Sequence, residues 1–273
     1  MPGKIRFPAV AGRFYPSDPK ELLDSIHSYL EPSIAGDLIP AIGCIVPHAG
    51  YVYSGATAGA VFSRIVIPNQ CILLCPNHTG QGTPLSIMTD GTWQTPLGMV
   101  QVNEGLAAAL KEHFPALNDD RLAHHNEHAI EVELPFLQVL TKNDFTIVPI
   151  VLGTQRYDVL RALGEVMAGV VATQPGKTLI IASSDMNHYE SDAITRVKDS
   201  KALEYILAMD AQGLSEVVLR ENISMCGMAA AVVMLTAARR QGATQAELIQ
   251  YATSADVSGD RTHAVGYAGV VVR

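Results

Sequence analysis

Positively charged residues are scarce in this 273-residue sequence. It has 19 lysines and arginines but 27 aspartates and glutamates, which gives a formal net charge of −8. A surface that binds a polyanion needs clustered lysine and arginine, so we expect no nucleic acid partner. Four cysteines are too few to form a disulfide scaffold in a chain of this length. The longest apolar stretch, 228–235, is far shorter than the roughly 18 residues of a membrane span, so no membrane partner is expected either.

The sequence also lacks the motifs of several common enzyme classes. Its glycines match neither a Walker phosphate loop nor a dinucleotide fingerprint, and no serine occupies a nucleophile elbow. The first residues, MPGKIRFP, contain no apolar core of a secretory signal. We therefore expect a cytoplasmic protein with reduced thiols, without a nucleotide cofactor and without serine-hydrolase chemistry.

Apolar residues are abundant, at 48% hydrophobic against 17% charged. Strand-length apolar runs alternate with amphipathic helix-length runs, and no linker divides them. This pattern predicts one α/β domain over residues 1–273, with a mixed, mostly parallel central sheet flanked by helices. Strands are expected at 41–46, 71–75, 145–152, 178–182, 248–253 and 265–272, and a hairpin-like pair at 85–88 with 99–102. Helices are expected from 17 onwards and at 54–65, 104–113, 128–140, 157–171, 195–209 and 227–240.

Polar side chains follow three of the predicted strands directly. His48 follows the first strand, His78 the second, and Asp185 with His188 the fourth. Open α/β sheets bind ligands at the carboxyl ends of their strands, so these residues converge on one pocket if the strands are parallel neighbours. Imidazoles in such a place are metal ligands, general acids or bases, or both.

One cysteine differs from the other three in its setting. Cys226 precedes the helix predicted over 227–240, and a helix N-terminus stabilises thiolate over thiol. We therefore predict an acidic Cys226 that acts as a metal ligand or nucleophile. Cys44, Cys71 and Cys75 lie in apolar strands and are interpreted as small core residues.

A further group of histidines occupies 124–128. On one helix, His124 and His128 would lie a turn apart and could share a metal ion. We favour the alternative in which Glu127 and His128 begin a helix and only one imidazole faces the pocket. His128 is then a group that either supports the ligands or faces the substrate, and His124 and His125 have no role in the site.

Several short motifs together resemble the Memo family, which in bacteria and archaea is also called AmmeMemoRadiSam system protein B. The motifs occur in the family's order and span most of the chain. They are AGRFYP at 11–16, PHAGYVYSG at 47–55, PNH at 76–78, EHAIE at 127–131, SSD at 183–185 with His188, and CG at 226–227.

This resemblance implies a fold similar to that of the class III extradiol dioxygenases, non-heme iron enzymes that open catechol rings. Animal members of the family are described as redox proteins that bind iron or copper, and as adaptors for phosphotyrosine peptides. The positions that match the family's metal ligands are His48, His78 and Cys226. Those that match its other pocket residues are Asp185, His188 and His128. The tyrosines of the matching motifs, Tyr15, Tyr51 and Tyr53, are assigned to substrate contact.

Two positions depart from the related proteins. Animal members carry Trp where this chain has Phe14, and the dioxygenases use a carboxylate where it has Cys226. A thiolate keeps the negative charge but softens the ligand set, which favours copper(I), zinc or a more covalent iron(II).

Three functions remain open at this point. The favoured one is a metal-dependent, dioxygenase-like oxidoreductase of a small molecule, with iron as the expected metal and copper or zinc as alternatives. In it, His188, Asp185 and His128 handle protons. The second is a non-catalytic adaptor that binds a short peptide or an anion. The third is a zinc hydrolase in which Asp185 is the base for zinc-bound water.

Overall fold

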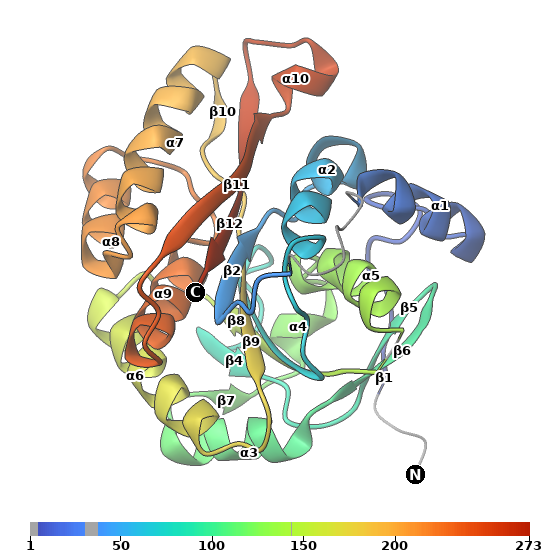
Figure 1. Cartoon of the computed structure of the whole chain (residues 1–273), viewed down its shortest axis with the longest axis vertical. Coiled ribbons are helices and arrows are strands. Elements are labelled where there is room, and N and C mark those ends of the chain that lie inside the picture. The colour runs from blue at the N-terminus through green and yellow to red at the C-terminus, as the bar shows by residue number, and fades with distance from the viewer. Residues whose placement is uncertain (1–4, 31–37, 143) are drawn as a thin grey trace.

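The computed structural model of the chain, which describes residues 5–30, 38–142 and 144–273, is built on one twelve-stranded mixed sheet (Figure 1). Its middle strands are parallel and almost entirely buried, which agrees with their continuous apolar sequences. In sheet order these strands are β8 (Thr146–Leu152), β3 (Gln70–Pro76), β9 (Thr178–Ser183) and β2 (Gly43–Val46). The partly exposed β6 (Gly98–Val102) pairs parallel with β8.

Antiparallel strands extend the sheet on both sides. Beyond β2, the long strand β12 (Ala264–Val272) pairs antiparallel with β2, β11 and β10. Beyond β6, β5 pairs antiparallel with β6, and β1 adds parallel to β5. The short strand β4 pairs with β8 and β7. The bounds of these elements are β1 (Ile5–Arg6), β4 (Leu85–Ile87), β5 (Thr92–Thr95), β7 (Asn118–Asp119), β10 (His188–Glu190) and β11 (Ala246–Thr253).

The hairpin expected from the sequence is wrong in its partners. The segment 85–88 does not pair with 99–102, because β5 and β6 form the hairpin and β4 lies along β8. Thr95 pairs with Gly98 across a two-residue turn. So short a loop costs little closure entropy and sets the register of the two strands, which favours the local pair over the longer connection.

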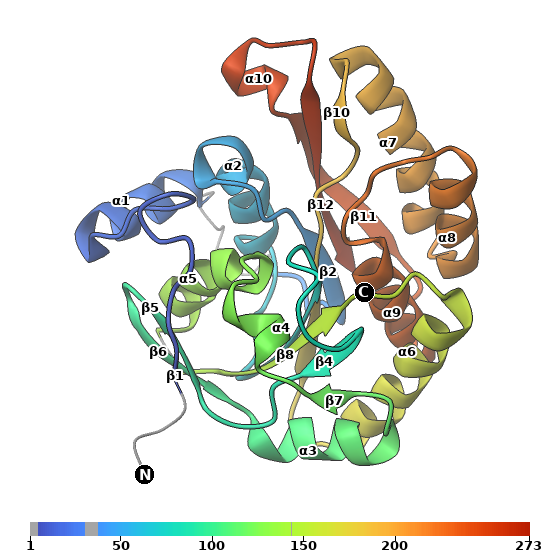
Figure 2. The ribbon, with the colours of Figure 1, turned by 180° about the vertical axis from the view of Figure 1, so that it is seen from behind.

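Helices cover both faces of the sheet (Figures 1 and 2). On one face lie α1 (Pro19–Tyr29), α2 (Tyr51–Phe62) and α5 (Ala129–Thr141). On the other lie α3 (Glu104–His113), α6 (Tyr157–Ala172), α8 (Ala211–Arg220) and α9 (Met228–Arg240), while α7 (Asp192–Leu207) packs on β11 and β12. The short helices are α4 (Leu122–His125) and α10 (Ala255–Ser258).

The alternation of strands and helices expected from the sequence is confirmed. The helices expected at 104–113, 157–171 and 227–240 are α3, α6 and α9 to within a residue. The helix α8 was not predicted. Within the described ranges, none of the helices combines the length and apolar character that a membrane crossing requires.

The order of the middle strands fixes where a site can form. Because β3, β9 and β2 are parallel neighbours, their carboxyl ends meet at one edge of the sheet. The strands are in near register, with Val46 of β2 opposite Ser183 of β9. The loops that leave this edge carry the histidines and aspartate noted in the sequence.

Candidate metal centre

Residues from three separate parts of the chain converge at the strand ends. His48 and His78 each lie two residues beyond the end of their strand, β2 and β3. Cys226 lies just before α9, which packs on the neighbouring strands. One ligand atom from each of these three side chains lies within 4.8 Å of the other two. The convergence expected from the sequence is therefore present.

This donor set fits a metal ion. The Nε2 atom of His48 lies 3.4 Å from the Sγ atom of Cys226. Metal–nitrogen and metal–sulfur bonds of roughly 2.1 and 2.3 Å, at tetrahedral angles, would separate these atoms by roughly 3.5 Å. Two imidazoles and one sulfur suit zinc, copper or iron(II) better than magnesium or calcium, which prefer oxygen ligands.

Cys226 can lie at this edge of the sheet because the residue that follows it, Gly227, has no side chain. A Cβ atom at Gly227 would lie 2.3 Å from Cβ of Ser184 and 2.4 Å from the carbonyl oxygen of Ser183, so only glycine allows this approach. The backbone N–H of Asp185 donates to Sγ of Cys226 at 3.3 Å. The Cys–Gly pair in the sequence thus has a steric reason.

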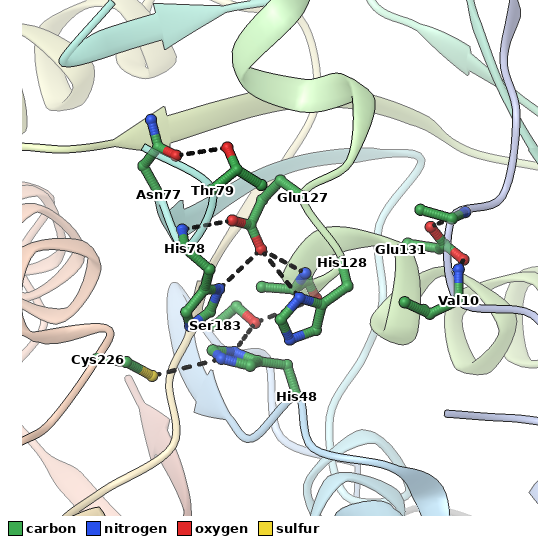
Figure 3. Close-up of polar contacts among 12 residues, drawn as sticks. Val10, His48, Asn77, His78, Thr79, Glu127, His128, Glu131, Ser183 and Cys226 are labelled. Carbon is green, nitrogen blue, oxygen red and sulfur yellow. Dashed lines mark hydrogen bonds and ion pairs between the residues drawn. The ribbon is translucent and has the colours of Figure 1, made fainter. Parts of the chain in front are cut away.

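In both histidines, the Nδ1 atom has a polar partner within the protein (Figure 3). Glu127, which is fully buried, accepts from the backbone N–H of His78 at 2.7 Å and lies 2.9 Å from its Nδ1. The Oγ atom of Ser183 lies 2.8 Å from Nδ1 of His48. Such partners fix the ring orientation of metal-binding histidines and leave Nε2 for the metal.

The two imidazoles differ in their electrostatics. Burial lowers the pKa of His48 well below its usual value, and the neighbouring histidines add to this effect. Burial also works to lower the pKa of His78, but the hydrogen bond and charge of Glu127 outweigh it, so that pKa is raised. A neutral His48 has a lone pair available for a cation.

The prediction of an acidic Cys226 is wrong for the protein without a cation. Burial raises the pKa of this thiol well above its usual value, and the nearby Asp185 raises it further. The N-terminus of α9 does not compensate, because desolvation of the thiolate costs more than the helix terminus returns. A metal ion at this place would supply the positive charge that the thiolate needs.

A cavity of about 580 Å³ opens over these residues. The ring of His128 stacks on that of His78 at 4.7 Å between centroids and packs on Phe14 at 4.8 Å. The predicted catalytic residues Asp185, His188 and His128 all line this cavity, together with the three candidate ligands. The exposed Tyr189, which has a positive φ of 61°, forms part of its wall.

The cavity contains groups suited to proton transfer. His188 contacts the carbonyl oxygen of Ser224 through Nδ1 at 2.8 Å; this nitrogen is therefore the donor, and Nε2 is the basic atom. Burial lowers the pKa of His128, with repulsion from His78 acting in the same direction against the charge of Glu127. Burial raises the pKa of Asp185. The site thus holds an imidazole whose Nε2 can accept a proton, beside an acid that is easier to protonate than usual.

The three tyrosines assigned to substrate contact lie elsewhere. None lines the histidine cavity; all three line a second cavity of about 520 Å³, which shares Phe14 and Gly50 with the first. The hydroxyl of Tyr15 donates to Glu131 at 2.6 Å and that of Tyr51 to the carbonyl of Val132 at 2.8 Å, and both side chains are buried. Tyr53 is 39% exposed.

His124, His125 and the other three cysteines lie as the sequence suggested. His124 is buried in α4, with its ring nitrogens near the carbonyl oxygens of Asp120 and Pro149, and His125 is exposed. Cys44, Cys71 and Cys75 are buried in β2 and β3. These five side chains lie outside the cavity that contains Cys226.

Residues that support the site were missed by sequence reasoning. Glu127 and Ser183 hold the two histidines, and Asn187 accepts from the backbone N–H and the hydroxyl of Ser224, both at 3.1 Å. This last contact ties the loop of Asp185 to the loop of Cys226. The sequence did contain one signal for buried supporting acids on α5. Glu131 and Glu133 lie in an apolar stretch, and a buried acid needs a specific partner.

A buried acid on α7 holds the same loop. Asp199 accepts from the backbone N–H of Asn187 at 2.8 Å and from the hydroxyl of Tyr251 at 2.7 Å. Burial raises the pKa of Asp199 to about 6, against a usual value of 3.8. The folded protein therefore holds this proton more tightly than the unfolded chain does.

Replacement of Asp199 by asparagine is expected to change how stability depends on pH. In the wild type, Asp199 makes the free energy of unfolding fall as pH rises from about 4 to 6, by about 3 kcal/mol. Urea unfolding at several pH values would show this component lost in Asp199→Asn. The same component should persist in Asp24→Asn, whose side chain is exposed on α1. An unchanged pH slope in Asp199→Asn would contradict the assignment.

Comparisons with known proteins cover nearly the whole chain. A family profile described as "Memo-like protein" matches residues 6–271. A "MEMO1 family protein" of Methanopyrus kandleri is 40% identical over 279 residues, which covers 98% of this chain and 99% of the relative. One of Archaeoglobus fulgidus is 42% identical over 269 residues, covering 98% and 100%. An uncharacterized protein of Escherichia coli K12 has a similar fold, with a TM-score of 0.52 at 10% identity over 82% of this chain and 98% of that one.

Proposed function

Because the chain belongs to the Memo-like protein family, we propose that it is a metal-dependent oxidoreductase of a small-molecule substrate, with a non-heme metal held by His48, His78 and Cys226. The metal we propose is iron, with copper or zinc as the alternatives that the sulfur ligand allows. The observation that carries this proposal is the convergence of three ligand atoms within 4.8 Å at the wall of a 580 Å³ cavity.

The cavity is suited to a reaction that needs both a metal and a proton acceptor. A bound iron or copper ion would supply redox chemistry with dioxygen, and three protein ligands leave coordination positions for other molecules. The basic Nε2 of His188 would accept a proton from the substrate, since Nδ1 is engaged with Ser224. Asp185 and His128 line the same cavity and would return or hold that proton.

The shape of the cavity favours a small and partly flat substrate. Phe14 and the imidazole of His128 provide stacking surfaces, and the volume suits a ligand of modest size. For Tyr53 we propose contact with a part of the substrate that extends past Phe14 into the second cavity. Tyr15 and Tyr51 would offer only ring atoms there, because their hydroxyls are bonded within the protein.

The metal content of Cys226→Ser tests the proposal. Protein purified without oxygen or chelator is expected to hold close to one iron or copper per chain in the wild type. Loss of the thiolate should weaken metal affinity at least tenfold in the variant, since even outer partners of metal ligands contribute 10–100-fold. Elemental analysis and oxygen consumption with catechol as the probe, both measured before and after metal removal, would check this.

The matched control is Cys71→Ser, because Cys71 is buried in β3 away from the cavity. Its metal content should equal that of the wild type. If neither the wild type nor Cys71→Ser holds metal after reconstitution, the oxidoreductase and the zinc hydrolase hypotheses both fail. A binding role for peptides or anions then takes their place. One zinc per chain without oxygen chemistry would favour the hydrolase.

A further inference from the structure

We infer that Glu133 and Ser183 are positioning residues that hold His48 in the tautomer that a metal ion requires. This inference rests on the proposed function for the identity of His48 as a ligand. The three residues come from α5, β9 and the loop after β2, and they form one continuous row of polar contacts through the core.

The distances define the order of the row. The Oγ atom of Ser183 lies 2.8 Å from Nδ1 of His48 and donates to Oε1 of Glu133 at 2.7 Å. The other ring nitrogen of His48, Nε2, faces Cys226 at 3.4 Å (Figure 3). All three residues of the row are at most 1% exposed, so water does not compete for these contacts.

The single proton of the serine hydroxyl links the two ends of this row. If Ser183 donates to Glu133, its oxygen accepts from Nδ1–H of His48, and Nε2 keeps its lone pair for a metal. If Ser183 instead donates to Nδ1, the ring proton moves to Nε2, and that nitrogen cannot bind a cation. The direction of one hydroxyl therefore decides whether His48 is ready for a metal.

Glu133 favours the metal-ready direction because its Oε1 accepts the serine proton. Burial raises the pKa of this carboxyl well above its usual value, and a proton on Oε2 leaves Oε1 an acceptor. The competing acceptor, the carbonyl oxygen of Ala129, lies 3.3 Å from Oγ, farther than Oε1 of Glu133. The second carboxyl oxygen of Glu133, Oε2, has no hydrogen-bond partner among the described residues. A carboxyl group in such a position is costly, and within the described chain Ser183 is its hydrogen-bonded neighbour.

The second ligand histidine has the same arrangement without the serine. Glu127 contacts Nδ1 of His78 directly at 2.9 Å. Both acids precede or lie in α5, so one segment of the chain orients both imidazoles. At His48 the serine stands between the ring and the acid, because Ser183 contacts both Nδ1 of His48 and Oε1 of Glu133.

The tautomer of His48 can be measured without any metal. Long-range ¹H–¹⁵N spectra of metal-free protein with ¹⁵N-labelled histidine, with the signal assigned through His48→Gln, should show the Nδ1–H form. Ser183→Ala is expected to shift His48 toward the Nε2–H form. Glu133→Leu should do so partly, because Ala129 still accepts, and Glu133→Gln should not, because its amide oxygen accepts the same proton.

Metal affinity should follow the same order. For zinc(II) or cobalt(II) alone, Ser183→Ala is expected to bind 10–100-fold more weakly, and Glu133→Gln within about threefold of the wild type. Ser215→Ala is the control for the spectra: Ser215 is buried on α8 and does not line the cavity that contains His48. The glutamate variants keep the test usable if Ser183→Ala does not fold.

Three results would overturn the inference. One is a wild-type His48 in the Nε2–H form; another is a His48 that keeps the Nδ1–H form in both Ser183→Ala and Glu133→Leu. The third is a change in Ser215→Ala equal to that in Ser183→Ala, because it would indicate general loosening of the core. If the tautomer responds as expected while no metal binds, the positioning role stands and the proposed function fails.

Discussion

Glu131→Ala is expected to lower the free energy of unfolding by about 4 kcal/mol, because it leaves a buried charge and several buried donors without their partner. Both side chains of the ion pair between Glu131 and Arg6 are almost fully buried. The same carboxylate accepts from the backbone N–H groups of Ala9 and Val10 at 2.8 and 3.0 Å, and from the hydroxyl of Tyr15 at 2.6 Å. A loss of this size is a large part of the stability of an average domain.

Chemical denaturation with a two-state fit would measure this loss. Glu204→Ala is a suitable control, since Glu204 is exposed on α7, and it should change stability by less than about 0.5 kcal/mol. A loss below about 1 kcal/mol in Glu131→Ala would mean that the N-terminal segment is not held by this contact. Because Phe14 follows in the same segment and packs on His128, a loosened segment should also open the cavity wall.

The second large effect is expected on metal affinity. Glu127→Ala should weaken binding of zinc(II) or cobalt(II) by about 100-fold, at the upper end of the range for partners of metal ligands. Glu127 acts twice on His78, through its backbone N–H at 2.7 Å and its Nδ1 at 2.9 Å, and it also accepts from the backbone N–H of Ala129 at 3.0 Å. Its loss frees both the ring and the loop that carries it.

Competition with a chelator of known affinity would measure this change. Glu127→Gln keeps an acceptor oxygen but not the charge, so its affinity should lie between those of the wild type and the alanine variant. Glu112→Ala, an exposed change on α3, should leave affinity unchanged. Equal affinity in Glu127→Ala and the wild type would show that His78 needs no support or does not bind the metal.

Much of the fold follows from patterns that are local in the sequence. The run 71–75 is apolar throughout, and it forms β3 in the buried centre of the sheet. The helix expected at 104–113 forms as α3, whose N-cap Asn103 accepts from the backbone N–H of Leu106 at 3.0 Å. The pairing of 85–88 was wrong, because apolar character alone does not tell which strand is the neighbour.

The residues of the candidate site were also predicted only in part. His48, His78, Asp185 and His188 were found because each follows a strand, and the parallel order brings those ends together. Cys226 was found from its place before a helix. Its raised pKa was not predicted, because a helix N-terminus can be recognised in a sequence whereas the desolvation of a side chain cannot. The tyrosines were assigned from their motifs, which do not tell which of two adjoining cavities they line.

The sequence by itself thus determined the class of fold, the residues at the strand ends and the family. Hydrophobic period and residue type, which act over a few positions, are enough for these. Only the tertiary structure decided which acid stands behind each imidazole, as Glu127 does for His78 and as Glu133 does through Ser183 for His48. Those contacts join residues 49 to 135 positions apart, and burial and hydrogen bonding at such separations exist only after the chain has folded.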